Sequence, residues 1–431
     1  MGNRTVPVSF FYFIEEGGMP KYDIACVGAG ISCLAAAALL TKAGKSVCLI
    51  DPADRAGGCV AAHEIEGFRF ASGPTITYGF EPGGVLRKLF SDLNLSANET
   101  SSFAGYQVVM PEHRISVSGE PGETLEELVR EFPDEMNGLT RLYRDVHKLS
   151  EQSSKSWLSS YVLRQRSSAA YLQSYRFSKS ILAYFEVQAR FFFGTSLQDL
   201  PLALLVLMLT TAPRSFPGGF TGLADKLISI VLQQKGTWFH GEPFPEMLFH
   251  ANRITGIRTS RGMIEPRTVL LNIPGQRSES IVFLGIRDEV IPVSMLPNVL
   301  CIDDNERLGD YFTLTLSPAD VRMAAPTGLI SLTCMFHSVN KAFDQPVESF
   351  ISKITAVVPF LQNFIVTSSM QDPHARQFPL PPSVIVQSSE YRVGRPMFLP
   401  CSVKNLKIIP DSVRSLLPAV LTAQAVVEKL K

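Results

Sequence analysis

The apolar positions near the start of the chain predict a strand, a turn, a helix and a second strand in close succession. The first strand-forming run covers Tyr22 to Val27 and leads into a glycine-rich turn. An Ala- and Leu-rich segment from Leu34 to Ala43 follows, and Gly44 closes it as is typical of a helix C-terminus. Ser46 to Ile50 is the next apolar run and predicts a buried strand. This order, within about 30 residues, is that of a βαβ unit in a parallel sheet.

A helical periodicity replaces the strand pattern in the next part of the chain. Apolar residues recur at intervals of three and four, and helical, aromatic sequence continues to Phe193. This stretch interrupts the sheet-forming sequence, so we expect it to form an inserted second domain. The residues that carry the periodicity are Leu125, Leu128, Val129, Phe132, Met136, Leu139, Tyr143 and Val146.

The longest apolar run, Leu200 to Leu209, is too short to span a bilayer, which requires about 20 residues. We expect a buried helix here, with Asp199 as its N-cap and Pro201 in its first turn. The alternatives are the wall of an apolar substrate tunnel or a surface patch that dips into lipid.

The sheet-forming pattern returns near Phe216 and continues to the end of the chain. An amphipathic helix carries Leu223, Leu227, Ile230 and Val231. Short strands are predicted at Met247–Phe249, Arg253–Arg258, Thr268–Asn272 and Leu329–Met335, and finally at Leu406–Ile409 before a helix over Ala419–Leu430.

Composition narrows the classes of partner. The chain has 431 residues, of which 45% are hydrophobic and 19% charged, so a large core is available and disorder is not expected. The formal net charge is +0, and no cationic face that would bind nucleic acid is evident. We therefore expect partners that are recognised by apolar contact.

Cysteine and histidine usage indicates neither disulfides nor metal. The seven cysteines are odd in number and contain no CxxC pair, which predicts inert core thiols in a reducing, cytoplasmic compartment. The seven histidines are scattered without ligand spacing on a recognisable helix, so no metal site is predicted. The first twenty residues lack a small-residue cleavage site, and we expect no signal peptide.

The glycine-rich turn carries a dinucleotide fingerprint. Gly28 permits the tight turn, and Gly30 lets the backbone approach a pyrophosphate at the positive N-terminus of the following helix. Cys33 stands at the third glycine position and is small enough for close helix–strand packing. The fingerprint reads Gly28, Ala29, Gly30, Ile31, Ser32 and Cys33.

Two additions strengthen the glycine signal. Asp51, followed by Pro52, ends the second strand 21 residues after Gly30, where a carboxylate accepts hydrogen bonds from ribose hydroxyls. An acid at this position disfavours the 2′-phosphate of NADP. The turn that follows contains Arg55, Gly57 and Gly58, which supply a cation and exposed amides close to a pyrophosphate and a flavin.

With these residues in place, the sequence resembles the phytoene desaturase and carotenoid isomerase branch of the amine-oxidase-like flavoproteins. The resemblance covers about the first 90 residues and about residues 215 to 275. It rests on the glycine fingerprint, on Asp51, on the motif DRAGG at residues 54–58 and on Gly67 to Pro74. The segments FPGGFTGLADKL at 216–227 and NRITGIR at 252–258 are similar to later motifs of that branch.

The resemblance implies a fold and a cofactor. It implies FAD held by a discontinuous Rossmann-like α/β domain with a central parallel sheet, made of residues 20–80, 215–275 and 396–431. Residues 81–214 and 276–395 would form an inserted α+β substrate or lid domain over an apolar substrate. Phe244 matches the position from which a strand residue contacts the adenine in that branch, and Asp411 matches a retained C-terminal acid near the flavin.

The C-terminal segment departs from the branch. Pro410 stands where the branch has glycine, and Ala419 and Ala423 replace further glycines. Proline cannot donate a backbone N–H, and methyl groups prevent the closest backbone approach to a cofactor. The flavin end of the site is therefore expected to differ from that of its relatives.

Three functions are compatible with these features. The first is an FAD-dependent oxidoreductase that desaturates or isomerises a hydrophobic polyene- or terpenoid-like substrate. The second keeps the flavin but acts on an amine, and the third is a non-catalytic homologue that binds nucleotide, lipid or protein. The sequence predicts a small hydrophobic substrate and no nucleic-acid partner, and it leaves peripheral membrane contact, oligomeric state and catalytic residues open.

Overall fold

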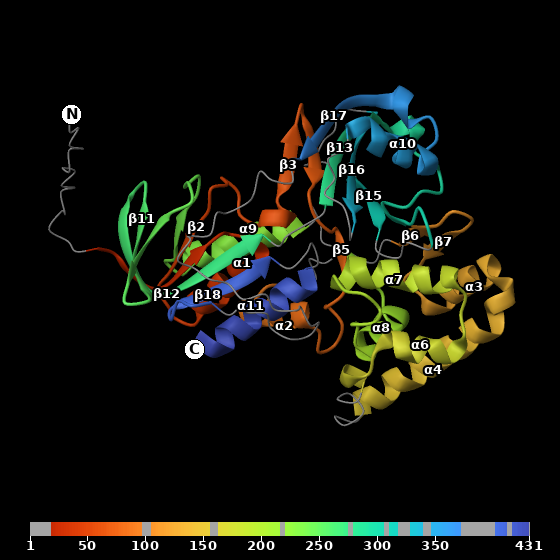
Figure 1. Ribbon diagram of the computed structural model, residues 1–431, viewed down its shortest axis with the longest axis horizontal. Helices are drawn as coiled ribbons and strands as arrows, with labels where there is room; N and C mark the ends of the chain where they lie inside the picture. The colour runs from red at the N-terminus through yellow and green to blue at the C-terminus, as the bar shows by residue number, and fades with distance from the viewer. Residues whose placement is uncertain are drawn as a thin grey trace, which may run out of the picture.

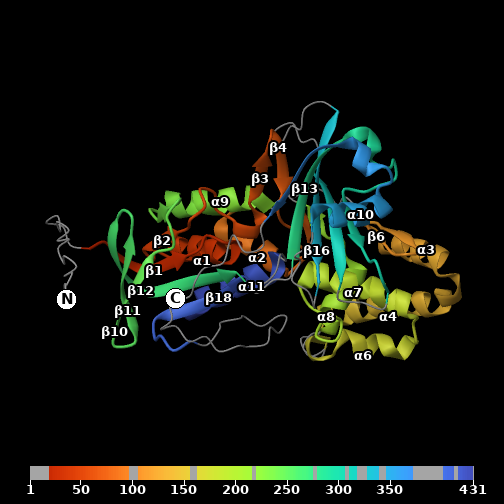
Figure 2. The same cartoon turned by 45° about the horizontal axis from the view of Figure 1, so that its top comes forward.

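The computed structural model describes residues 19–96, 105–155, 163–215, 220–274, 279–305, 310–317, 328–338, 346–371, 401–411 and 416–430. Two large sheets lie in different parts of the molecule (Figure 1), and a layer of helices underlies the second sheet. The turned view in Figure 2 shows the same division, with α1, α9 and α11 beside the first sheet.

The first sheet has a parallel core with strand order β18-β12-β1-β2-β9. Its longest strand, β12, also pairs antiparallel with β11, which in turn pairs with β10. The change of partner occurs along β12 itself, because Ile264 faces β11 whereas Glu265 already pairs with β1. The strands are β1 (Lys21–Val27), β2 (Val47–Ile50), β9 (Thr237–Phe239), β10 (Glu246–His250), β11 (Arg253–Thr259), β12 (Gly262–Pro274) and β18 (Leu406–Asp411).

Helix α1 (Ile31–Lys42) lies at the centre of the packing around this sheet. Every residue from Ile31 to Thr41 is buried, and the run of four alanines lets neighbouring helices approach closely. The neighbours that share its core are α2 (Val85–Leu93), α9 (Phe220–Gln233) and α11 (Leu416–Leu430). The opposite face of the sheet is covered by residues of β10, β11 and the segment before β18.

The second sheet has strand order β17-β13-β16-β15-β14-β6-β7, and only the β14–β6 pair among these is parallel. Helix α10 (Val347–Val357) packs Phe350 and Ile354 into the core on one face. The strands are β6 (Tyr106–Val109), β7 (Arg114–Val117), β13 (Glu279–Arg287), β14 (Asn298–Cys301), β15 (Tyr311–Ser317), β16 (Leu329–His337) and β17 (Ile365–Gln371).

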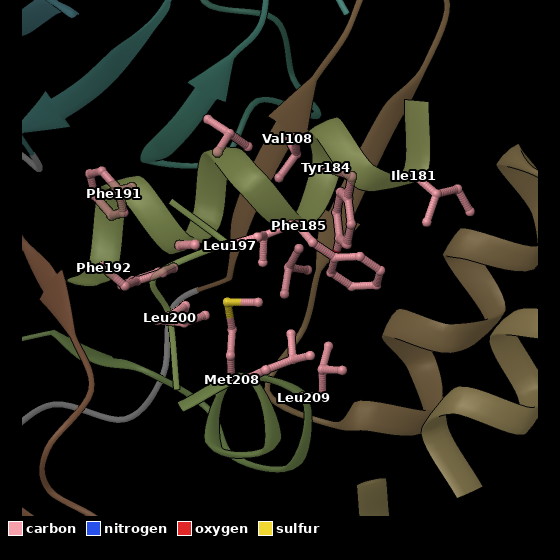
Figure 3. Close-up of a cluster of buried hydrophobic side chains, with 14 of the residues drawn as sticks. Val108, Ile181, Tyr184, Phe185, Phe191, Phe192, Leu197, Leu200, Met208 and Leu209 are labelled. Atoms are coloured by element: carbon pink, nitrogen blue, oxygen red, sulfur yellow. The ribbon is translucent and has the colours of Figure 1, made fainter. Parts of the chain in front are cut away.

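A layer of helices shares an aromatic-rich core with β6 and β14. Figure 3 shows Tyr184, Phe185 and Phe192 of α7 directed toward Met208 and Leu209 of α8. The helices are α3 (Pro121–Glu131), α4 (Met136–Lys155), α6 (Ser168–Leu172), α7 (Lys179–Phe193) and α8 (Leu202–Thr210). Two short pairs, β3 (Ala62–Ile65) with β4 (Phe68–Ala71) and β5 (Ile76–Thr77) with β8 (Arg214–Ser215), complete the described strands.

The run from Leu200 to Leu209 forms α8, which is largely buried as expected, but its predicted cap is wrong. Pro201 is the N-cap residue, and no side chain caps the helix. The carboxylate of Asp199 instead accepts a hydrogen bond from the Ser196 hydroxyl at 2.9 Å. That local bond holds Asp199 in the turn before the helix, where it cannot reach the first-turn amides.

The predicted fold class is confirmed, because the parallel Rossmann-like sheet is assembled from distant segments around a separate α+β unit. The helix predicted at Ala419 begins earlier, at Leu416. Helix α2, from the segment 81–214 that we assigned to the lid, packs in the core of the first sheet. The domain boundaries stay a prediction.

Candidate functional site

The predicted site residues gather where the parallel strands of the first sheet end. Because β1, β2, β12 and β18 are parallel, their carboxyl ends share one edge of the sheet. The chain passes from β1 through α1 to β2 on one side, whereas β12 lies on the other side of β1. Such a switch in strand order opens a crevice in which α/β proteins bind ligands.

The glycine turn between β1 and α1 has the geometry that its sequence predicts. Gly28 has φ +97°, a conformation that L side chains rarely adopt, and its N–H donates to Ile50 O at 2.8 Å. Gly30 is the N-cap of α1 and provides no side-chain cap. The first-turn amides of α1, beginning at Ile31, therefore have neither an intrahelical partner nor a capping side chain at Gly30.

Ser32 lies in the first turn of α1 with its side chain fully buried. Its hydroxyl has no hydrogen-bond partner among the described residues. A buried hydroxyl without a partner is costly, and its position beside the positive end of a helix suits an anionic oxygen. Ser32 thus fits the predicted pyrophosphate subsite, which Ala29 and Ile31, both buried, adjoin through the backbone.

Asp51 joins the end of β2 to the glycine turn. Its Oδ2 accepts the Ala29 N–H at 2.5 Å, and its Oδ1 accepts the Ala53 N–H at 2.8 Å. The residue is partly exposed, and Pro52 next to it is exposed. Its exposure and its place at the end of β2 suit the ribose hydroxyls that we predicted it to bind.

The turn that follows Asp51 folds back onto the glycine turn. The Gly57 N–H donates to Ala29 O at 2.8 Å, and Gly57 forms a parallel β-bridge with Gly30. A Cβ at Gly58 would lie 3.0 Å from the Gly30 Cα, so the two turns touch. Arg55 is exposed and lies in an ion pair with Glu64, with its Nη1 3.1 Å from Oε1. The guanidinium that we expected near a pyrophosphate is thus held toward β3.

The positions of Phe244 and Asp411 do not test their predicted contacts with a cofactor. Phe244 is half-buried against the β10–β11 side of the sheet, but it lies in the loop between β9 and β10 rather than in a strand. Pro243 and Pro245 flank it and remove backbone donors that a strand requires. Asp411 is the last residue of β18 and is paired with Pro274 of β12. Contact of either residue with a cofactor stays a prediction.

The loop that carries Phe244 is fixed by a buried acid that the sequence did not single out. Glu242 is 2% exposed, and its N–H donates to Asp51 O at 3.0 Å. Its carboxylate accepts hydrogen bonds from the N–H and the hydroxyl of Ser260, the latter at 2.6 Å. Glu242 therefore ties the end of β2 to the turn between β11 and β12.

Asn272 is a second residue that sequence reasoning missed. It lies near the carboxyl end of β12, is 5% exposed and contacts the glycine turn. Its Nδ2 donates to Ile409 O of β18 at 3.4 Å. The available signal was a polar residue at the end of the otherwise apolar strand segment Val269–Ile273.

A second polar cluster lies in the helical layer, around a cavity of about 10 Å³ lined in part by Tyr78, Tyr143, Tyr184 and Gln188. The Tyr106 hydroxyl donates to Gln188 Oε1 at 2.5 Å, and the Tyr78 hydroxyl donates to Met208 O at 3.3 Å. Burial raises the pKa of all four tyrosines, so the phenols are neutral at physiological pH. A cavity of this size holds about one water molecule.

The buried cysteines have the properties of core thiols. Burial raises the pKa of Cys48 to about 12 and that of Cys301 and Cys334 well above the usual value. A thiol with a raised pKa is a poor nucleophile at neutral pH. Within the described ranges, no group of three or more potential ligands that could hold a metal ion is found. Nor does any helix in these ranges have the length and apolarity needed to cross a membrane.

Comparison with known proteins bears on the first site. Residues 26–93 match the family described as NAD(P)-binding Rossmann-like domain. Prolycopene isomerase 1 of an Oncidium hybrid cultivar is 27% identical over 180 residues, which are 40% of this chain and 30% of that protein. The 4,4′-diapophytoene desaturase of Staphylococcus haemolyticus is 31% identical over 142 residues, or 31% of this chain and 27% of that protein. The matches thus span less than a third of these relatives.

Solved structures resemble the whole chain. Rab GDI from Plasmodium falciparum has a TM-score of 0.64 at 12% identity, covering 96% of this chain and 98% of that one. An oxidoreductase from Methanosarcina mazei has a TM-score of 0.61 at 15% identity, covering 95% and 100%. Putrescine oxidase bound to putrescine has a TM-score of 0.58 at 15% identity, covering 95% and 99%. At these identities the likeness shows the fold alone.

The curated relatives match the branch that the motifs predicted, and the structural neighbours share its architecture. The resemblance is therefore confirmed: over 142 to 180 residues the chain is similar to a prolycopene isomerase and a diapophytoene desaturase, which belong to the branch that its motifs predicted.

Proposed function

We propose that this chain binds FAD at the carboxyl edge of the first sheet and acts as an FAD-dependent oxidoreductase on a hydrophobic, polyene- or terpenoid-like substrate. The observation that carries the proposal is the joint placement of Asp51, the Gly28–Gly30 turn and the unpartnered Ser32 hydroxyl. Together they offer acceptors for a ribose and donors for a diphosphate, which are the two parts of an ADP group.

The residues fit the ADP half of the cofactor on chemical grounds. Asp51 would accept hydrogen bonds from the ribose hydroxyls, because its carboxylate is partly exposed and lies at the end of β2 beside the glycine turn. The uncapped start of α1 and Ser32 would donate to the diphosphate. When bound, FAD would supply a two-electron acceptor for a hydride from one carbon of the substrate, and the adjacent carbon would lose a proton to solvent.

A hydrophobic substrate is supported by the second unit and by the names of the relatives. Its cores are dominated by aliphatic and aromatic side chains, and Leu204 and Leu207 of α8 remain only partly buried. The curated relatives are named for carotenoid isomerisation and desaturation. Apolar walls orient a substrate chiefly by shape and by excluding water.

Two alternatives have specific support. The likeness to putrescine oxidase favours an amine as the substrate. The altered C-terminal segment favours cofactor binding without turnover. Pro410 of β18 lies opposite Ile273 of β12 and offers no backbone N–H to a cofactor. β18 pairs only with β12 among the described strands, and an edge strand tolerates a proline there.

The absorption spectrum of the purified protein separates these functions. We expect flavin bands near 370 and 450 nm, either as purified or after addition of FAD (roughly the range in which bound flavins absorb). Anaerobic bleaching by a polyene but not by a diamine would support the proposed substrate class, and the reverse would favour the amine. A protein that stays colourless after FAD addition would rule out both flavin enzymes.

A further inference from the structure

We infer that Asn272 is a steric determinant of dinucleotide affinity, because its carboxamide covers the face of Gly30 that a pyrophosphate must approach. The inference rests on the proposed dinucleotide site and adds to it a residue outside the fingerprint. Asn272 comes from β12, more than two hundred residues away in sequence, and reaches the site at the switch between β1 and β12.

The position of the carboxamide follows from the space around Gly30. A Cβ built on Gly30 would lie well under 3.0 Å from Asn272 Oδ1 and 3.3 Å from its Cγ. The absent side chain at this second glycine is what allows the backbone to approach a pyrophosphate. The Asn272 side chain therefore occupies the direction that the glycine leaves open.

The opposite side of the turn is already filled. Gly57 and Gly58 lie against Ala29 and Gly30, through the Gly57–Ala29 hydrogen bond and the bridge between Gly57 and Gly30. A diphosphate that reaches the start of α1 must therefore displace one of these two neighbours. Displacing Asn272 costs less free energy, because its side chain can rotate whereas the glycine turn is held by backbone hydrogen bonds.

The bonds that hold Asn272 in place are weak enough to be exchanged. Its one described hydrogen bond runs from Nδ2 to Ile409 O and is long, at 3.4 Å. Rotation breaks this bond and adds a rotamer cost, and together these lower the apparent affinity for the dinucleotide. Removing the carboxamide eliminates the cost, so a smaller residue at position 272 should bind the dinucleotide more tightly.

The test measures FAD and ADP binding by calorimetry in wild type, Asn272→Ala and Asn272→Leu. ADP contains the diphosphate and ribose without the flavin, so its affinity reports on this half of the site alone. We expect Asn272→Ala to bind both ligands about threefold to tenfold more tightly than wild type. Asn272→Leu keeps the bulk without the polar group and should bind no more tightly than wild type.

Asn405→Ala is the matched control. Asn405 is also a buried asparagine, 7% exposed, and lies in the turn before β18, but its Nδ2 donates to Ile254 O and Arg267 O away from the glycine turn. Its loss should lower the melting temperature without changing either affinity at a temperature where the protein is folded.

The outcomes separate the two claims. Wild-type binding with no gain in Asn272→Ala, or an equal gain in Asn272→Leu, would overturn the inference and leave the dinucleotide site standing. Binding by Asn272→Ala where wild type binds neither ligand would support the inference in its strongest form. If no variant binds FAD or ADP, both the inference and the proposed function are wrong.

Discussion

The carboxylate of Asp51 holds the glycine turn to the end of β2, with its Oδ2 2.5 Å from the Ala29 nitrogen and its Oδ1 2.8 Å from the Ala53 nitrogen. One side chain thus fixes the backbone on both sides of the proposed ribose position. Hydrogen bonds to a charged acceptor are stronger than those between neutral groups. Asp51 therefore has a structural role in the free protein as well as a proposed role in binding.

Asp51→Asn should lower both stability and nucleotide affinity. An amide offers one acceptor oxygen in place of two, so either Ala29 or Ala53 loses its acceptor. We expect a loss of about 1–3 kcal/mol in the free energy of unfolding, measured by urea titration. Affinity for ADP should fall in parallel. Asp54→Asn is the control, because the Asp54 side chain is 87% exposed and its removal should change stability by less than about 0.5 kcal/mol. Equal stability of Asp51→Asn and wild type would contradict the structural role.

Gly30 and Asn272 should be energetically coupled. The backbone of Gly30, with φ −63° and ψ 158°, suits any L residue, so Gly30→Ala costs stability only through its neighbours. The nearest is the Asn272 carboxamide. We expect Gly30→Ala to cost about 1–3 kcal/mol in the wild-type background and clearly less beside Asn272→Ala, as a double-mutant cycle would measure.

Gly28→Ala provides the contrast for that cycle. Gly28 has φ +97°, and its nearest neighbours are the Cβ and the backbone oxygen of Asn272, which remain in Asn272→Ala. Its cost should therefore be the same in both backgrounds. Additive effects of Gly30→Ala and Asn272→Ala would show that the carboxamide does not restrict position 30.

Glu64→Gln should release Arg55 toward an anionic ligand. The Arg55–Glu64 pair is half-exposed on both sides, so its loss should change stability by no more than about 1 kcal/mol. We expect Glu64→Gln to tighten ADP binding and Arg55→Ala to weaken it, with both effects shrinking at high salt. Asp303→Asn removes an ion pair with Lys353 in the second unit and should leave ADP affinity unchanged. Identical affinities in the two site variants would place Arg55 outside the ligand's reach.

The sequence predicted those parts of the site whose residues lie close together in one continuous segment of the chain. The Gly28–Gly30 turn and Asp51 could be identified because a βαβ unit fixes their spacing within one continuous segment. Asn272 could not be assigned to the site, since its role depends on the pairing of β12 with β1. No local pattern in the sequence predicts which strand lies beside β1. The same holds for Glu242, whose partner Ser260 lies on a later turn.

The two local predictions that went differently have local causes. Asp199 is the type of residue that caps helices, but the Ser196 hydroxyl already uses its carboxylate. Phe244 was matched to a strand position, but its flanking prolines keep the segment out of the sheet. At Asp199 a competing hydrogen bond prevented the predicted helix cap. At Phe244 the loss of backbone donors prevented the predicted strand.

The tyrosine cluster of the helical layer should make the protein sensitive to alkali. Burial raises the folded-state pKa of Tyr143, whereas the same phenol ionises near pH 10 in the unfolded chain. Its contribution to stability is therefore complete below about pH 10 and is lost as the pH rises above that value toward the folded-state pKa. Each such tyrosine lowers the free energy of unfolding by about 1.4 kcal/mol per pH unit in this window.

Tyr143→Phe tests this linkage, because it removes the ionisable hydroxyl and keeps the buried ring. At pH 7 the variant should unfold at nearly the same urea concentration as wild type. Between pH 10 and 11 its stability should fall about 1 kcal/mol less than that of wild type, because the phenol of the unfolded chain is already half ionised at pH 10. Tyr106→Phe should flatten the same slope but also lose stability at pH 7, because it removes the bond to Gln188. Parallel pH profiles for wild type and Tyr143→Phe would mean that Tyr143 ionises in the folded protein as readily as in the unfolded chain.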